Sequence, residues 1–402
     1  MKTATKMKTR FFTALASACV FSTAAFGEPN QPEKETMFGE FPKPATVEEL
    51  RAYAATRKDA AKTANKIAGI RRLWHDMKSE NFYPEGCLTA ALKTRDEWSD
   101  FDFMFFTTIS GTLFTQVYGR GSDGLIDALD HRPMPHIYKE IGYSHIYIDR
   151  ETITGHPDLV MEVIKAAVDK GVPVMSGGIG NVPMPGRLDE GHGCACNIGG
   201  YDEGGTLLVN VFMEDAVADE HGYCAIKDGL KGSSGLYILG EKQEAVKPAD
   251  AYRKAVRSIP AFVSLPATDN AAFGQQAFYK WADAMLKDGA LDLENWGVYN
   301  GPWIQLLTNE YYMRNFFDRV INASGLPEAK KAREIYMRIY AFCPDIQRLH
   351  GGDLFPSREA INRREVREEI AGILRNMGDL HNELLALFDE KNGVKNEEIP
   401  QW

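Results

Sequence analysis

The amino-acid sequence predicts an α+β region followed by an all-helical region. Short apolar runs and glycine-rich connections alternate with an amphipathic helical pattern in residues 143–240, which is typical of a sheet covered by helices. After residue 241 the pattern changes to a succession of long amphipathic helices. We therefore expect an α+β domain over residues 79–240 and a helical C-terminal domain over residues 241–402.

The composition is that of a globular protein with substantial hydrophobic cores. Of the 402 residues, 44% are hydrophobic and 25% are charged, which excludes a disordered chain. The 46 Lys and Arg residues are outnumbered by 56 Asp and Glu residues, giving a net charge of -10. Because binding to nucleic acid relies on clustered cations, the sequence predicts no nucleic-acid partner.

The first 27 residues have the pattern of an export signal. A basic start precedes the apolar stretch FFTALASACVFSTAAF, and the small residues Ala25 and Gly27 follow at cleavage spacing. The apolar run is about 16 residues long, shorter than the roughly 20 that span a bilayer. We expect cleavage near Gly27, and an exported mature protein, periplasmic or extracellular, without a stable membrane span.

Residues 28–78 are predicted to form a leader followed by N-terminal helices. Thr46 and Glu49 have the spacing of a capping box at a helix start. Apolar residues at helical spacing continue as far as Ile70 and Leu73, which predicts one or two amphipathic helices.

A cysteine opens the next predicted helix. In SENFYPEGCLTAALK, Cys87 follows a Pro-Glu-Gly segment that reads as a turn, and it precedes an apolar run. In the first turn of a helix, backbone N–H groups and the helix dipole lower the pKa of a thiol. The aromatic run FDFMFFTTISGTLFTQVYG that follows is either a buried strand or a buried helix.

The middle of the chain gives clearer signals for strands. Alternating isoleucines predict a strand, and GCACNIGGYDEGGTLLVNVF predicts a β-hairpin with a glycine-rich connection. In chain order we expect a strand within 142–151, a helix at 156–171 closed by Gly171, a short strand at 172–178 that ends in glycines, the hairpin at 193–212 and a strand at 235–242.

Cysteine counting favours a thiol at Cys87. Five cysteines remain after cleavage of the signal, and an odd number in an oxidising compartment leaves at least one unpaired. We expect Cys87 to be the unpaired one, and Cys224 to form a bridge with Cys194 or Cys196.

The residue types needed for thiol acyl transfer occur in a suitable order. This chemistry uses a thiolate, an imidazole that exchanges its proton, a group that orients the imidazole, and donors for the oxyanion. Cys87 starts the predicted helix, and Asn81 lies on the loop before it. His192 stands at the entrance of the hairpin, and Asn210 lies on its returning strand.

Over residues 79–240 the chain resembles the papain-like thiol fold in its broad sense. The motifs EGCLTAAL, KGVPVM and GGYDEGGTLLVNV are similar to those of C39-like peptidases and of the acyltransferase domain typified by the butirosin-biosynthesis H protein. The helical region that follows is similar to the extension of bacterial proteins of this type. The resemblance implies a peptide, amide or thioester substrate and an acyl-enzyme, and it implies no cofactor.

By this resemblance Cys87 would be the nucleophile, His192 the base, Asn210 the residue that orients the imidazole and Asn81 the oxyanion donor. One departure concerns the histidine, because Cys194 occupies the position about six residues before Gly200 where the family histidine usually stands. On a continuous strand His192 would share the face of Cys194, roughly 7 Å farther along.

Two further interpretations belong to other classes of protein. A catalytically inactive papain-like binding or scaffold protein would keep the fold without a correctly placed histidine; His192 is then a surface residue of a flexible loop. We expect His136 and His145 to be structural, and either is an alternative base for the enzymatic interpretation.

A structural module stabilised by zinc or by a disulfide is the third interpretation. His192, Cys194 and Cys196 provide nitrogen and sulfur ligands suited to tetrahedral zinc, with Cys224 or His221 as the fourth ligand.

Overall fold

The computed structural model describes residues 41–58, 61–73, 80–92, 101–212, 215–352 and 354–389. The export signal predicted for residues 1–27 lies outside these ranges, as does most of the leader before residue 41. The fold is of mixed α/β type, with helices and antiparallel strands.

The chain forms two compact units that interleave along the sequence. Unit 1 contains Pro42–Phe103 and Gly142–Glu244, and unit 2 contains Met104–Ile141 and Ala245–Trp402. The second transition falls close to the boundary expected near residue 241. Residues 104–141, which we assigned to the α+β domain from the sequence, group with the C-terminal helices instead.

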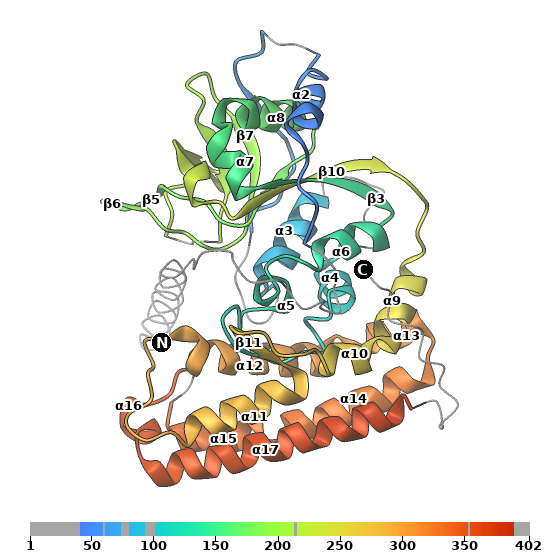
Figure 1. The fold of residues 1–402 in the computed structure, drawn as a ribbon, viewed down its shortest axis with the longest axis vertical. Coiled ribbons are helices and arrows are strands. Elements are labelled where there is room, and N and C mark those ends of the chain that lie inside the picture. Colours follow the sequence, from blue (N-terminus) through green and yellow to red (C-terminus); the bar gives the residue numbers. More distant parts are fainter. Residues whose placement is uncertain are drawn as a thin grey trace, which may run out of the picture. The chain divides into compact units, whose positions relative to one another are not determined.

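Unit 1 is built around a seven-stranded sheet in which all neighbouring strands are antiparallel (Figure 1). The strands expected from the alternating pattern and from the hairpin are present. Their order across the sheet is β3 (Tyr143–Asp149), β10 (Gly235–Lys242), β4 (Val174–Ser176), β7 (Cys196–Tyr201), β8 (Leu207–Asn210) and β9 (Tyr223–Ile226), with β1 (Asn65–Lys66) paired to the end of β7.

The two faces of this sheet differ in chemistry because side chains alternate along each strand. One row of register partners is apolar apart from a terminal thiol: Ile146, Ile238, Val174, Ile198, Val209 and Cys224. The neighbouring row, on the other face, contains amides and phenols: Tyr147, Tyr237, Met175, Asn197, Asn210 and Tyr223. The polar side chains of the hairpin therefore gather on one face.

Helices cover both faces of the sheet (Figure 1). The amphipathic helix α8 (Pro157–Asp169) packs on β4 and β7, and α2 (Val47–Ala54) packs on α8. On the other side α3 (Tyr83–Leu92) packs against β7. A short helix, α7 (Arg150–Gly155), follows β3, and the small hairpin of β5 (Val182–Met184) and β6 (Arg187–Asp189) precedes the segment that leads into β7.

The N-terminal segment confirms the capping prediction and corrects the helix length. The Thr46 backbone N–H donates to Glu49 at 2.7 Å, and Glu49 N–H donates to the Thr46 hydroxyl at 3.2 Å. The helix ends at Ala54, however, and residues 61–73 contain no helix. Ile67 instead donates its N–H to the carbonyl of Gly199 on β7. The apolar side chains of this segment, such as Ile70 and Leu73, are therefore buried although the segment is not helical.

Unit 2 is mainly helical, as the C-terminal pattern predicts. The aromatic run after residue 100 contains both structures that its pattern allowed, because it begins with a buried helix, α4, and ends in a short strand, β2. The helices are α4 (Phe103–Ile109), α5 (Leu125–Ala128), α6 (Met134–Glu140), α9 (Pro248–Arg257), α10 (Ile259–Val263), α11 (Gly274–Met285), η4 (Trp296–Val298), α12 (Asn300–Asn315), α13 (Phe317–Ser324), α14 (Pro327–Tyr340), α15 (Cys343–His350), α16 (Arg358–Ile361) and α17 (Arg364–Leu387), and β2 (Val117–Gly119) pairs with β11 (Ala271–Phe273).

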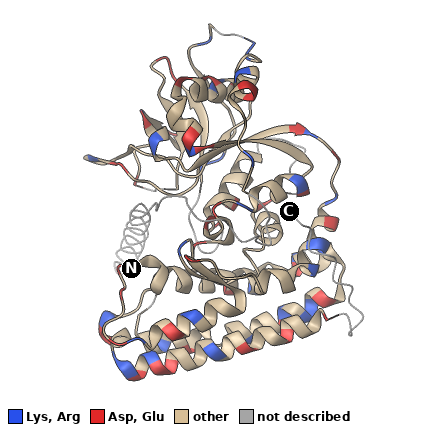
Figure 2. Ribbon diagram, in the orientation of Figure 1, with Lys and Arg blue, Asp and Glu red and all other residues tan. Residues whose placement is uncertain are grey.

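The long helix α17 has the solvated charged face that its mixed composition indicates. Acidic and basic residues both occur along its length (Figure 2). Arg364 donates to Glu368 one turn further on at 2.9 Å, and Arg375 pairs with Asp283 of α11 at 3.0 Å. Water and salt screen exposed pairs of this kind, so they add little to stability and the buried faces of the helices supply most of it.

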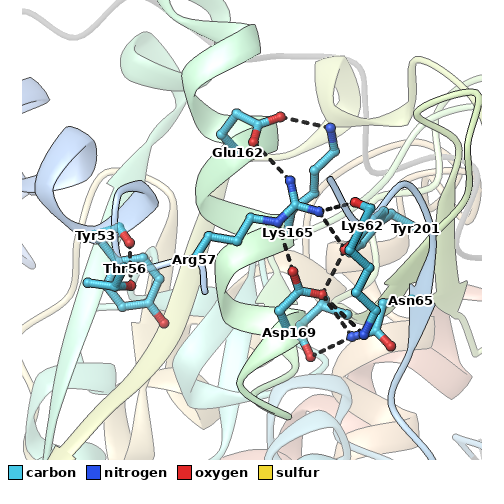
Figure 3. A network of polar contacts seen from close by, with 10 residues as sticks. Tyr53, Thr56, Arg57, Lys62, Asn65, Glu162, Lys165, Asp169 and Tyr201 are labelled. Atoms are coloured by element: carbon cyan, nitrogen blue, oxygen red, sulfur yellow. Dashed lines mark hydrogen bonds and ion pairs between the residues drawn. The ribbon is translucent and has the colours of Figure 1, made fainter. Parts of the chain in front are cut away.

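A polar network fixes the N-terminal segment of unit 1 to α8 and β7 (Figure 3). Arg57 donates through Nε to Asp169 and through Nη2 to the Tyr201 hydroxyl, each at 2.8 Å. Tyr201 in turn donates to Asp169 at 2.7 Å, and Asn65 does so at 2.8 Å. Burial raises the pKa of Asp169, but the hydrogen bonds from Arg57, Tyr201 and Asn65 outweigh it, and the net pKa is lowered.

Replacing Asp169 by Asn should destabilise unit 1 at neutral pH. Breaking a largely buried pair leaves Arg57 with only the more exposed carboxylate of Glu162 as counter-charge, which costs about 3 kcal/mol in the free energy of unfolding. Because the folded-state pKa lies below the unfolded value, the Asp169 contribution is present at pH 7 and disappears as the pH falls through the lowered pKa. Urea unfolding at pH 7 and at pH 3 measures both effects.

Glu162 provides the matched control for this prediction. A carboxylate oxygen of Glu162 lies 3.3 Å from Nη1 of Arg57, and the Glu162 side chain is 46% exposed. Glu162→Gln should therefore cost less than about 1 kcal/mol. Equal losses for the two variants would contradict the central role of Asp169.

Candidate functional site

Cys87 lies inside α3 rather than at its tip. The helix begins at Tyr83, so the Pro-Glu-Gly segment expected to form a turn is already helical. Proline is well tolerated in the first turn of a helix because its missing N–H has no partner to lose there. Cys87 is the fifth residue of the helix, beyond the first turn in which the dipole acts most strongly on a thiol. Its side chain is 0% exposed.

One hydrogen bond joins the Cys87 turn directly to the sheet. Asn197 of β7 donates from Nδ2 to the Cys87 carbonyl oxygen at 2.9 Å. Asn197 is fully buried, and its amide oxygen Oδ1 has no hydrogen-bond partner among the described residues. Sequence reasoning missed Asn197; the signal was its place in the hairpin, directly opposite Asn210.

Aromatic packing holds α3 against the end of β8. A Cβ atom on Gly86 would lie 2.8 Å from the Phe212 ring, so glycine allows this close approach. The Tyr83 ring meets Phe212 edge to face, with ring centroids 5.1 Å apart. Since Phe212 follows the predicted site residue Asn210 by two positions, the helix of Cys87 and the strand of Asn210 lie together.

Asn210 and Asn81 are both buried. Asn210 faces Asn197 on β7 and Tyr223 on β9, and all three side chains share the face toward α3. Burial raises the pKa of Tyr223 to about 12, while the amide of Asn210 acts in the opposite direction. Asn81 lies two residues before α3, next to Glu80, whose carboxylate pairs with Arg71.

His192 is buried, not a surface histidine. Its exposed fraction is 1%, and neither ring nitrogen has a hydrogen-bond partner within the described ranges. The structure thus shows no hydrogen bond from its ring to the Cys87 sulfur. Burial lowers the pKa of His192 to about 4, and the charge of Asp189 opposes the shift.

The expected alternation from Cys194 back to His192 does not occur. β7 begins at Cys196, and residues 192–195 are not part of a strand, so the two-residue period does not extend to His192. The His192 carbonyl instead accepts the Ile179 N–H at 2.9 Å, which holds the segment against the glycine-rich loop after β4. Its position follows from this loop contact.

The expected disulfide is not formed. The cysteines at 87, 194, 196, 224 and 343 are all buried thiols. Cys224 on β9 is separated from β7 by the whole of β8, a distance of about two strand spacings of 4.8 Å. Disulfides require Cα atoms within about 7 Å, so Cys196 cannot reach Cys224, and Cys194 is in no disulfide either.

No group of three or more His, Cys, Asp and Glu side chains in the described parts of the chain is arranged to hold a metal ion. His192, Cys194 and Cys196 therefore do not form a zinc cluster with Cys224 or His221. Within the strand, Cys196 faces away from its neighbour Asn197. Burial is the largest cause that raises the pKa of the Cys196 thiol.

The two other candidate bases occupy structural positions. His145 lies on β3 beside Tyr237, with ring centroids 6.5 Å apart. His136 lies on α6 in unit 2, where Glu140 is 3.9 Å from its Nδ1. Burial lowers the pKa of His136 to about 3 and also lowers that of His145.

The chain matches no protein-family model and no curated protein. Among the residues that the structure describes, no helix has the length and apolar character needed to cross a membrane.

Unit 1 should lose stability in acid because of His192. The folded-state pKa of about 4 lies below the ordinary value near 6.5, so only the unfolded chain takes up this proton between those values. Lowering the pH from 7 to 4 should cost about 3 kcal/mol through this residue. Hydrogen exchange of the β7 amides as a function of pH measures the loss.

His192→Gln should flatten this pH dependence, because glutamine does not titrate. The exposed His221 supplies the control, since its replacement by Gln should leave the wild-type slope in place. An unchanged slope in the His192 variant would show that other groups cause the acid sensitivity.

Proposed function

We propose that unit 1 is a papain-like, C39-like domain of an exported enzyme that transfers or hydrolyses acyl groups through an acyl-enzyme at Cys87. The observation that carries the proposal is the contact between the helix of Cys87 and the hairpin strand at Asn197. The contact places the helix of Cys87 over the polar face of the sheet. On that face lie the side chains of Asn197, on the strand that follows His192, and of Asn210, on the next strand.

The proposed reaction uses the four residues in the roles that the resemblance implies. The Cys87 sulfur attacks an acyl carbonyl, and a C–S bond forms as the bond to the leaving group breaks. His192 takes the thiol proton and gives it to the departing amine or thiol, Asn210 orients the imidazole, and Asn81 donates to the oxyanion. Water or an amine then attacks the thioester and releases the thiol.

This chemistry requires a change around the sulfur before reaction. A general base must approach to about 3 Å of the atom whose proton it takes, and such bonds often tighten only when substrate binds. Since Cys87 and His192 are both buried, α3 or residues 192–195 must move for an acyl donor to reach the sulfur. An amide, peptide or thioester is the substrate class that fits a thiol nucleophile.

Iodoacetamide should alkylate Cys87 selectively near neutral pH if the thiol is activated. His192→Ala should slow this alkylation by roughly 100-fold, the contribution typical of a general base. Peptide mass spectrometry measures the rate at each cysteine, with the buried Cys343 of unit 2 as the internal reference. The exposed His221 provides a matched variant, His221→Ala, whose rate should equal that of the wild type.

A catalytically inactive papain-like binding or scaffold protein is the second candidate. It is favoured by the full burial of Cys87 and by the absence, in the described structure, of a hydrogen bond from either His192 ring nitrogen. Equal alkylation of Cys87 in the wild-type chain and in His192→Ala would support this candidate and contradict the enzymatic one.

A further inference from the structure

We infer that Asn197 is the positioning residue of the proposed thiol site, and that its amide sets the height and rotation of the Cys87 turn above the sheet. This inference rests on the proposed function, because positioning has a chemical consequence only if Cys87 reacts. Asn197 acts through the backbone of Cys87 and is therefore distinct from the residues that would touch a substrate.

The amide of Asn197 makes a single hydrogen bond to the Cys87 turn. Nδ2 of Asn197 lies 2.9 Å from the Cys87 carbonyl oxygen, within a fully buried environment. A helical carbonyl has two lone pairs, so it can accept this bond in addition to the one from within the helix. The bond reaches the same residue that carries the sulfur, so a shift of the amide also displaces the Cβ–Sγ bond.

No other described hydrogen bond fixes the orientation of the Asn197 amide. Its Oδ1 has no hydrogen-bond partner among the residues described, although a buried acceptor without a partner costs about 1–3 kcal/mol. An apolar residue would avoid this cost, as Met175 does at the neighbouring position of the same row. The chain therefore carries a buried amide whose one described side-chain bond is directed at Cys87.

The strand that carries Asn197 is held on both sides. Asn197 lies between Cys196 and Ile198, which are both fully buried, and its register partners are Met175 on β4 and Asn210 on β8. An interior position in a sheet leaves the side chain little freedom to follow the helix. Asn197 is consequently a fixed reference point against which α3 is placed.

The test separates positioning from simple packing by using two reagents on the same sulfur. p-Nitrophenyl acetate acetylates a thiol through an oriented attack and releases p-nitrophenol, whereas iodoacetamide reports mainly the access to the thiol. Asn197→Leu should lower the ratio of acetylation rate to alkylation rate at Cys87 about tenfold or more, because misplacement of reacting groups is costly. A proportional change in both rates would overturn the inference.

Asn197→Asp supplies the conservative rescue. Burial raises the pKa of the introduced carboxyl, and its protonated form can donate a hydrogen bond to the Cys87 carbonyl whereas its ionised form cannot. Relative to the wild-type chain at the same pH, the ratio should recover at pH 5.5 and fall at pH 8.5. Met175→Leu changes packing in the same row without removing a donor, and it should leave the ratio unchanged.

A second measurement distinguishes failure of the inference from failure of the proposed function. If the wild-type Cys87 is not acetylated at all, the acyl chemistry is contradicted, and hydrogen exchange of the α3 amides then tests the positioning contact alone. Faster exchange in Asn197→Leu than in Met175→Leu supports the contact. Equal exchange in the two variants contradicts it.

Discussion

The two-residue alternation of β7 is the constraint on which the arrangement of unit 1 depends. Because neighbouring side chains on a strand point to opposite faces, Cys196 and Ile198 lie on one face and Asn197 lies on the other. A register slip of one residue would place the amide among the apolar partners of α8 and would bring a thiol beneath α3. The contact with Cys87 therefore requires the register with β4 and β8 that the structure shows.

An irregularity in the same strand connects the site to the N-terminal segment. The register between β7 and β8 shifts between Ile198 and Gly200, so one residue is added without a partner and the alternation is reset. Tyr201 then has the orientation needed to reach Asp169 of α8, where Arg57 also binds. The six residues of β7 therefore make contacts on both faces of the sheet. Asn197 binds the helix of Cys87 on one face, and Tyr201 binds Asp169 on the other.

The sequence predicted elements whose signals are local and failed where tertiary contacts decide. Alternating isoleucines, the glycine-rich hairpin and the amphipathic α8 were all identified, because period and turn chemistry determine them. The extended course of residues 61–73 depends on pairing with the end of β7, which no local pattern reveals. The helical state of Pro84 was missed because proline is compatible both with a turn and with the first turn of a helix.

The candidate residues show the same division. Chain order alone predicts that Cys87, Asn81 and Asn210 belong to one α+β unit. It does not predict that all three side chains are buried there. The predicted alternation extended from the hairpin to His192, but the strand begins only at Cys196, and the His192 carbonyl accepts a hydrogen bond from Ile179 in a loop. Asn197 follows the closely spaced Cys194 and Cys196, which were the candidates in that segment of the sequence. Only its register opposite Asn210, seen in the structure, marks it as a site residue.

The position of Cys87 determines where any activation of its thiol must come from. Beyond the first turn, the helix dipole contributes little, so ionisation depends on a base. Proton transfer from an ordinary thiol, with a pKa of about 8.5, to an imidazole with a pKa of about 4 is unfavourable by roughly 6 kcal/mol. Returning His192 to its ordinary pKa by hydration or by a counter-charge reduces this to about 3 kcal/mol. In the proposed reaction, the same opening that admits an acyl donor to Cys87 would also make His192 a better base, because burial is what lowers its pKa.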